Sequence, residues 1–231
     1  MKRLIYAALT VGLTPVLISS DPASLAAQPS QGVLEATRSA NPALSNFFAQ
    51  GLEQVKKGNY REAIADFTHA IEIEANNADA YNNRGISRAK LGDKQGAIAD
   101  FTQAIKIDTN KANAYYNRGV TRADSGDKQG AIADFTQAIK IDTNNTKSYS
   151  IRGFIYYELG DKQRAIADFT KAIEINPKFA DAYYNRGIAR KQLEDKQGAL
   201  VDFQKAADLY QQQGKINYYQ DALYQIQKLQ H

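Results

Sequence analysis

The stretch DKQGAIADFTQAIKIDTN fills residues 93–110 of this chain, and the same eighteen residues return at 127–144. The two copies lie 34 positions apart, and other short motifs keep the same step. An Asp-Phe pair occurs at 66–67, 100–101, 134–135, 168–169 and 202–203. A fixed period of about 20–50 residues predicts an array of stacked structural repeats, each burying its apolar face against its neighbours.

Each period is expected to contain two helices. Within residues 95–107 the apolar side chains follow one helical stripe, made of Ala97, Ile98, Phe101, Ala104 and Ile105. Residues 79–91 form the other predicted helix, in which Tyr81, Gly85 and Ala89 share a face. Between the two, Gly92 permits a turn and Asp93 can cap the following helix.

The recurrent glycine of the first helix indicates close helix packing. A glycine inside a helix costs about 1 kcal/mol relative to alanine, yet Gly51, Gly85, Gly119, Gly153 and Gly187 keep the 34-residue step. We expect a compensating close contact with the second helix, in which Ala97 and Ala104 are the small partners.

This pattern resembles the tetratricopeptide repeat (TPR) family, whose repeat is a helix-turn-helix of the same length. The resemblance implies an all-α solenoid, a right-handed superhelix of five repeats at 44–77, 78–111, 112–145, 146–179 and 180–213. The chain departs from the family pattern in several places. Arginine replaces the usual leucine before the glycine, Pro177 is the only repeat-end proline, and Glu194 replaces the last turn glycine.

The two ends of the chain differ from the repeats. Residues 214–231 predict a capping helix that packs through Ile216, Tyr219, Leu223 and Ile226, with glutamines on its other face. Residues 1–26 have the form of a signal peptide, with Lys2 and Arg3 before an apolar stretch at 4–18. Residues 27–43 are expected to be a linker.

The signal predicts an exported protein, in the periplasm or the thylakoid lumen, with an uncleaved N-terminal anchor as the alternative. After signal removal no stretch is apolar enough for a stable membrane span. The chain has no cysteine, which excludes disulfides and thiolate metal sites. Its net charge is +4, and the basic residues are interleaved with acidic ones, so no nucleic-acid partner is expected.

The resemblance also implies that the first helices line a concave groove. The residues predicted to bind a partner there are Asn82, Asn83, Tyr116, Asn117, Lys147, Phe154, Tyr157, Tyr184, Asn185 and Lys191. An asparagine row in register could hold the backbone of an extended peptide, although Ile151 interrupts it. The alternatives are local hydrogen bonding of each amide and packing of the aromatic rings between first helices.

Two other ligand classes fit the sequence less well. The residues at the positions of the chaperone-binding carboxylate clamp lack its arginine and first lysine, so this clamp is not expected. The row of Arg84, Arg118, Arg152 and Arg186 could bind phosphates, but each repeat also carries an aspartate, and structural Arg–Asp pairs between helices are the preferred interpretation.

No catalytic constellation is present. His69 and His231 are far apart, and no phosphate-binding loop, HExxH or GxSxG motif occurs. The sequence therefore predicts a protein that is not an enzyme, needs no cofactor or metal, and binds a protein or peptide through its groove. The alternatives are a self-associating structural scaffold and, less favoured, a nucleic-acid binder.

Overall fold

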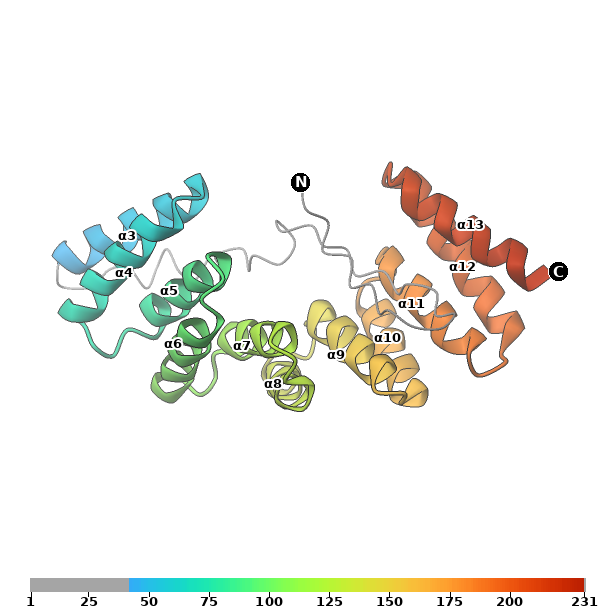
Figure 1. Cartoon of the computed structure of the whole chain (residues 1–231), viewed down its shortest axis with the longest axis horizontal. Helices are drawn as coiled ribbons and strands as arrows, with labels where there is room; N and C mark the ends of the chain where they lie inside the picture. Colours follow the sequence, from blue (N-terminus) through green and yellow to red (C-terminus); the bar gives the residue numbers. More distant parts are fainter. Residues whose placement is uncertain (1–41, 231) are drawn as a thin grey trace. The chain divides into compact units, whose positions relative to one another are not determined.

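The computed structural model describes residues 42–230, which form eleven α-helices and no strand (Figure 1). The predicted signal peptide and almost all of the predicted linker lie outside these residues. The described helices fall into two compact bodies, residues 42–143 and residues 144–230, which we call the N-terminal and the C-terminal body. Each body is a stack of helix pairs, as an all-α TPR solenoid requires.

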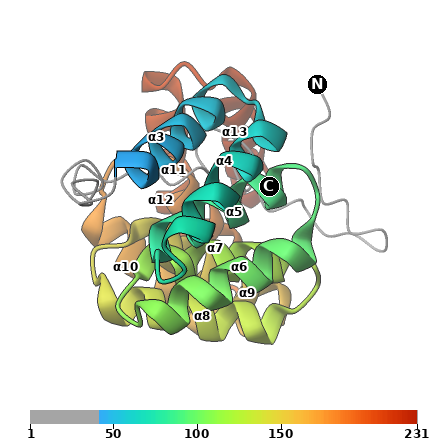
Figure 2. The same cartoon turned by 90° about the vertical axis from the view of Figure 1, so that its left-hand side faces the viewer.

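The N-terminal body contains three helix pairs, and α4, α5, α6, α7 and α8 each pack on the helix before (Figure 2). Its helices are α3 (Pro42–Lys57), α4 (Tyr60–Ile73), α5 (Ala78–Lys90), α6 (Lys94–Ile107), α7 (Ala112–Asp124) and α8 (Lys128–Ile141).

The C-terminal body contains two helix pairs and one further helix. Its helices are α9 (Thr146–Glu158), α10 (Lys162–Ile175), α11 (Ala180–Lys191), α12 (Lys196–Gln212) and α13 (Ile216–Gln230). The odd-numbered helices α3 to α11 are the first helices of their repeats, and the even-numbered helices α4 to α12 are the second.

The turn between the two helices of a repeat is built as the sequence predicts. Gly92 has a φ of +87°, the left-handed conformation that glycine adopts without strain. The Asp93 carboxylate accepts a hydrogen bond from the Gly96 amide at 2.9 Å, which caps α6. Glu194 has to adopt the same kind of turn with a side chain, at a φ of +63°.

The close contact at the recurrent glycine is real, but the predicted partner was wrong. A Cβ atom at Gly85 would come within 2.7 Å of the Phe101 ring, and the same relation joins Gly187 to Phe203 at 2.9 Å. Ala97 and Ala104 are fully buried elsewhere along α6. An aromatic ring is flat, so its edge fits against a bare backbone where a methyl group would collide.

Small residues also join successive repeats. Ala80 of α5 packs on Ala70 and Ile71 at the end of α4, and all three are buried. Alanines 114 and 182 repeat this contact on the second helix that precedes each of them. A first helix therefore needs a small residue where it meets the preceding repeat.

The arginine row is used for structural pairing, as expected, and each pair lies within one repeat. Arg118 donates two hydrogen bonds to the Asp134 carboxylate, at 2.7 and 3.0 Å. A third guanidinium nitrogen donates to Thr102 Oγ1 of the preceding repeat. The other three Arg–Asp pairs are Arg84–Asp100, Arg152–Asp168 and Arg186–Asp202. Such bidentate pairs fix the orientation of the two helices.

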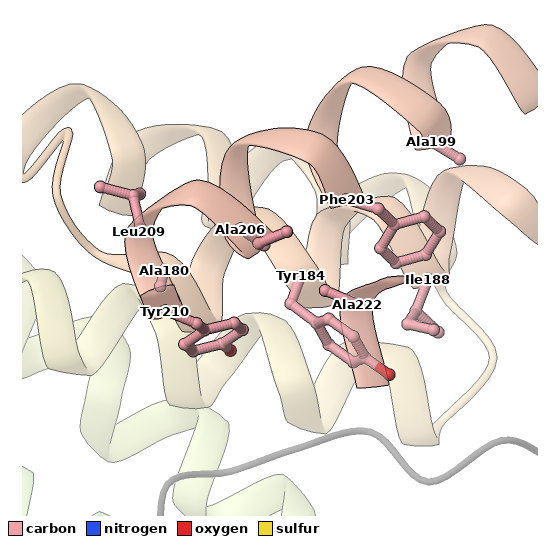
Figure 3. Close-up of a cluster of buried hydrophobic side chains, with 10 residues drawn as sticks. Ala180, Tyr184, Ile188, Ala199, Phe203, Ala206, Leu209, Tyr210 and Ala222 are labelled. Atoms are coloured by element: carbon pink, nitrogen blue, oxygen red, sulfur yellow. The ribbon is translucent and has the colours of Figure 1, made fainter. Parts of the chain in front are cut away.

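The capping helix α13 covers the end of the stack, but with a different face from the one predicted. Ala222 is fully buried in a cluster with Tyr184 and Tyr210 (Figure 3), and Tyr218 and Leu229 also pack there. Ile216 and Leu223 of the predicted stripe are exposed. Tyr219 and Ile226 of that stripe do pack against the cluster.

Candidate functional site: the inward face of the first helices

All ten predicted binding residues lie on first helices. Four belong to α5 and α7 in the N-terminal body, namely Asn82, Asn83, Tyr116 and Asn117. Six belong to α9 and α11 in the C-terminal body, namely Lys147, Phe154, Tyr157, Tyr184, Asn185 and Lys191. Their burial separates them into core residues and accessible residues.

The asparagines of the N-terminal body bond to the protein itself. Asn117 Nδ2 donates to Asn82 Oδ1 at 3.0 Å, and both side chains are buried. Asn83 Nδ2 donates to the carbonyl oxygen of Asp79, one turn earlier in α5. Both bonds match the alternative of local satisfaction, and the bond between Asn117 and Asn82 joins α7 to α5. Peptide binding by these amides stays a prediction.

Tyr116 is also a core residue. Only 6% of it is exposed, and its ring meets Phe135 edge-on with centroids 5.8 Å apart. Burial raises the pKa of its hydroxyl to about 12, because the phenolate would lose its hydration. This geometry matches the packing alternative for the ring.

Tyr184 and Asn185 are buried in the C-terminal body. The Tyr184 ring lies 5.5 Å from Phe203 and 6.4 Å from Tyr210, centroid to centroid. Burial, with a smaller contribution from Asp221, raises the pKa of Tyr184 to about 12. Five of the ten predicted residues, Asn82, Tyr116, Asn117, Tyr184 and Asn185, thus belong to the core of the two bodies.

Apart from the half-buried Asn83, the accessible residues of the predicted site lie in the C-terminal body. Phe154, Tyr157 and Lys191 are half-buried, and Lys147 is exposed. Tyr157, Lys191 and Gln225 occupy the same repeat position on α9, α11 and α13, because they follow one another at intervals of 34 residues. We call these three residues, together with Gln192, the C-terminal polar row.

Hydrogen bonds join the three helices along this row. Gln192 Nε2 donates to the hydroxyl oxygen of Tyr157, which links α11 to α9. Lys191 Nζ donates to Gln225 Oε1 at 2.9 Å, which links α11 to α13. The side chains of the row are therefore held in place before any ligand arrives, which lowers the entropy cost of binding.

Acidic groups lie beside the row. Burial raises the pKa of Asp221 on α13 above its ordinary value. Deeper in the body, Tyr210 donates from its hydroxyl to Asp181 Oδ1 at 2.8 Å. Burial raises the pKa of Asp181, and the nearby Lys215 ammonium opposes that shift.

Comparison with known families decides the identity of the repeats. Tetratricopeptide repeat models match residues 78–111, 112–145 and 180–215. The first two ranges have the same bounds as the second and third predicted repeats. A TPR repeat model matches residues 51–92 and 153–194. The matches together cover well over half of the chain. The chain belongs to the tetratricopeptide repeat family.

Several solved TPR structures are similar to this one. A crystal structure of MamA is 27% identical, with a TM-score of 0.67 over 71% of this chain and 96% of that one. MamA from Desulfovibrio magneticus RS-1, residues 41 to the end, is 19% identical, with a TM-score of 0.69 over 76% and 99%. Comparison with curated proteins gives no match.

A third similar structure is that of YrrB, described as a TPR protein with an unusual peptide-binding site. It is 21% identical, with a TM-score of 0.62 over 78% of this chain and 91% of YrrB. At this identity the likeness concerns the TPR fold alone.

Sequence reasoning missed that α13 contributes a residue to the C-terminal polar row and a ring to the core of the C-terminal body. Gln225 bonds to Lys191, and Tyr218 stacks on Tyr210 with centroids 5.4 Å apart. The signal was present, because Tyr218 and Gln225 follow Tyr184 and Lys191 by one repeat length. The repeat register therefore continues into a helix that had been taken only for a cap.

The described TPR helices contain neither a metal-binding cluster nor a membrane-spanning helix. Among residues 42–230 no group of three or more histidine, aspartate or glutamate side chains is arranged to hold a metal ion. In the same range no helix combines the length and the apolarity that crossing a membrane requires. His69, on the exposed side of α4, lies 3.0 Å from Glu72.

Proposed function

We propose that this TPR protein is an exported, non-enzymatic adaptor that binds a peptide or a protein segment at the C-terminal polar row. The observation that carries the proposal is the row itself. Tyr157, Lys191 and Gln192 are half-buried and Gln225 is buried. Hydrogen bonds between α9, α11 and α13 hold these side chains in position, and the half-buried Phe154 lies one turn before Tyr157 on α9. The TPR family consists of interaction scaffolds, and YrrB, named for a peptide-binding site, has the same fold.

The variation between repeats supports this location. Helices α6 and α8 have identical sequences and bury the same five positions, as expected of helices whose inner side is fixed by packing. The position of Tyr157 and Lys191, in contrast, is occupied by Ala89 in α5 and Ala123 in α7. Large polar side chains at this position are thus special to the C-terminal body.

The chemistry of the row indicates the ligand class. The Lys191 ammonium has two protons besides the one it donates to Gln225, and these suit backbone carbonyls or a carboxylate of an incoming segment. The Phe154 and Tyr157 rings offer apolar area with little side-chain entropy to lose. An extended segment with an apolar residue next to an acidic or amide group fits this combination.

Photo-crosslinking in the native cell tests the proposal. A photoreactive benzoylphenylalanine replaces Tyr157 or Lys191 in turn, and adducts are identified by mass spectrometry. Both positions are expected to label the same protein, and Lys191→Ala should weaken labelling from position 157. The matched control is the exposed Lys171 on α10. Equal labelling from position 171 would contradict binding at the row.

Export is proposed from residues 1–26, through the basic pair, the apolar stretch and the small residues Ser24 and Ala26. The periplasm and the thylakoid lumen are the candidate compartments. Mass spectrometry of the native protein should find a mature N-terminus near Ala27 in the envelope or lumen fraction. A chain that keeps Met1 in a membrane fraction would support the uncleaved anchor, and a cytosolic chain would reject export.

A structural scaffold that associates with itself is the second candidate function. It is favoured by one observation, the exposed apolar side chains of α13.

A further inference from the structure

The outer side of α13 carries an apolar surface that the C-terminal body leaves uncovered. Ile216 is 56% exposed and Leu223 is 42% exposed. They lie seven residues apart, two helical turns, so both side chains project from the same side of α13. Tyr224, next to Leu223, is also exposed.

These two positions are core positions in the regular repeats. Ile216 corresponds to Ala80, Ala114 and Ala182, which are fully buried at the contact with the preceding second helix. The residues that correspond to Leu223 are also buried, and they are Ser87, Thr121, Ile155 and Ala189. In α13 both positions carry large, fully apolar side chains that are exposed to solvent.

The size of the side chains explains why α13 turns this surface outward. The contact with a preceding second helix admits only a small residue, which Ile216 is not. α13 instead presents Ala222, fully buried, to the cluster that contains Ala206 and Tyr210. The helix is thus rotated about its axis relative to a regular first helix, and Ile216 and Leu223 leave the core.

The outer side of α13 does not suit another second helix of the TPR type. Regular first helices use a glycine against the phenylalanine ring of the second helix, and α13 has Asp221 at that position. Three of them, α5, α7 and α11, also use two arginines, such as Arg118 and Arg122 of α7, to pair with its aspartate. In α13 these positions are Gln220 and Tyr224, so neither the close approach nor the ion pairs can form.

The pattern on this side of α13 suits a second helix of its own kind. Ile216 and Leu223 are exposed, and Tyr219 and Ile226 lie at the edge of this side, half-buried against the core cluster. The four residues alternate at spacings of three and four, the repeat with which two helices pack side by side in a coiled coil. Gln220 and Gln227 flank the seam, and the seam carries no charge. An isologous interface brings like residues together, so a neutral seam avoids self-repulsion.

We propose that α13 pairs with α13 of a second copy of this chain, and that this forms a tail-to-tail dimer about a two-fold axis near Asp221. The two helices run antiparallel. A parallel pair would place Lys215 and Lys228 beside their own copies and would align the two helix dipoles. The antiparallel pair packs Ile216 against Ile226, and Leu223 against Tyr219, across the axis. The dimer rests on the second candidate function, self-association, and its surface is separate from the C-terminal polar row on which the adaptor proposal depends.

Sedimentation of the full chain over a range of concentrations tests the dimer. Leu223→Glu is expected to weaken self-association at least tenfold, because it puts a charge into each half of the seam. Ile216→Glu should do the same, and it lies in the first turn of α13, where the helix dipole favours an acid. Val201→Glu is the matched control, because Val201 is 53% exposed on α12 of the same body.

The apolar N-terminal stretch is common to all of these variants, so differences between them report on α13. A wild-type chain that stays monomeric at high concentration would overturn the proposal. Equal effects of Leu223→Glu and Val201→Glu would also overturn it.

Crosslinking through single cysteines tests the direction of the pair, because the natural chain contains no cysteine. Leu223→Cys lies near the proposed axis and should be trapped as a dimer by a short bismaleimide. Ile216→Cys and its copy would be about 15 Å apart along the antiparallel helices, at 1.5 Å per residue, and should not react. Crosslinking of both variants would show a parallel pair. Crosslinking of neither variant above the level of the reference Val201→Cys would reject the interface.

Discussion

The two bodies are made of the same repeat, yet α11 of the C-terminal body is buried more fully than any first helix of the N-terminal body. In α5 of the N-terminal body four residues are buried, and two of them are the polar Asn82 and Ser87. In α11 of the C-terminal body eight residues are buried, and Tyr184 and Ile188 are the largest. The comparison teaches that the repeat sets where a helix lies, while its neighbours decide how much of it becomes core.

The cause of the difference is a change at the end of one second helix. α6, α8 and α10 have 14 residues each and end before Asp108, Asp142 and Asn176, which adopt an extended conformation. The equivalent residue of α12 is Tyr210, and this helix has 17 residues. The added turn puts Leu209 and Tyr210 into the core, where α13 covers them.

The largest expected effect comes from removing the tyrosine that distinguishes the C-terminal body. Tyr210→Ala empties a fully buried site and should cost about 3–5 kcal/mol of the stability of this body. Hydrogen exchange should show loss of protection in α12 and α13 and unchanged protection in α3 to α8.

Tyr210→Phe is the control for this substitution. It keeps the ring, removes the hydrogen bond to Asp181, and should cost about 1–2 kcal/mol. If Tyr210→Ala lowered protection equally in both bodies, the two bodies would unfold together, and the prediction of a loss confined to the C-terminal body would be wrong.

A second contrast concerns the buried aspartates. Asp134 in the N-terminal body binds both Arg118 and Arg122, whereas Tyr156 takes the place of the second arginine beside Asp168 in the C-terminal body. Asp134→Asn should cost about 3 kcal/mol and Asp168→Asn about 2 kcal/mol, because the first removes a carboxylate from two guanidinium groups and the second from one. Arg122 keeps only the longer contact with Asp127, at 3.6 Å. Urea unfolding measures both. A larger loss for Asp168→Asn would contradict this account.

The turns give a smaller and opposite pair of effects. Glu194 holds a φ of +63° where Gly126 of the N-terminal body has +86°. Glu194→Gly should stabilise the chain by about 1 kcal/mol, because it removes the strain of a side chain in the left-handed region. Gly126→Glu should destabilise it by a similar amount. Thermal unfolding should move by about 2–4 °C in opposite directions, and a shift of the same sign in both variants would refute the turn argument.

The smallest effect concerns pH. Burial raises the pKa of Asp181, so the folded state disfavours its charged form. Burying the charged carboxylate therefore lowers the free energy of unfolding. This loss is complete above the pKa that Asp181 has in the folded protein, and it disappears below the ordinary value of 3.8. Asp181→Asn keeps an acceptor for Tyr210 and should therefore gain up to about 1 kcal/mol at neutral pH.

The gain of Asp181→Asn over the wild-type chain should shrink as the pH falls toward 3.8. Urea unfolding of both proteins at several pH values measures it. A gain that does not change with pH would mean that the charge of Asp181 is not its cause.

Much of this molecule could be predicted from local sequence. The period of 34 residues, the two helices per repeat, the glycine turn and the Asp93 cap depend on residues close together in the chain. The Arg–Asp pairing was also predicted, because repeated opposite charges at fixed spacing have few other partners. The predicted binding residues Phe154, Tyr157 and Lys191 are accessible, whereas Tyr116, Tyr184 and Asn185 are buried. For these three the sequence left both binding and packing open, because side-chain burial depends on residues far away in the chain.

The sequence by itself determined the repeat, its turns and its helix faces, because helix periodicity and turn chemistry act over a few residues. Only the tertiary structure decided which of two apolar stripes of α13 becomes core. Ile216 and Leu223 are the more apolar stripe, but Ala222 is the residue that fits against α12. Packing selects for size and shape as well as hydrophobicity, and the shape of the space against α12 is set by residues such as Tyr184 in another helix.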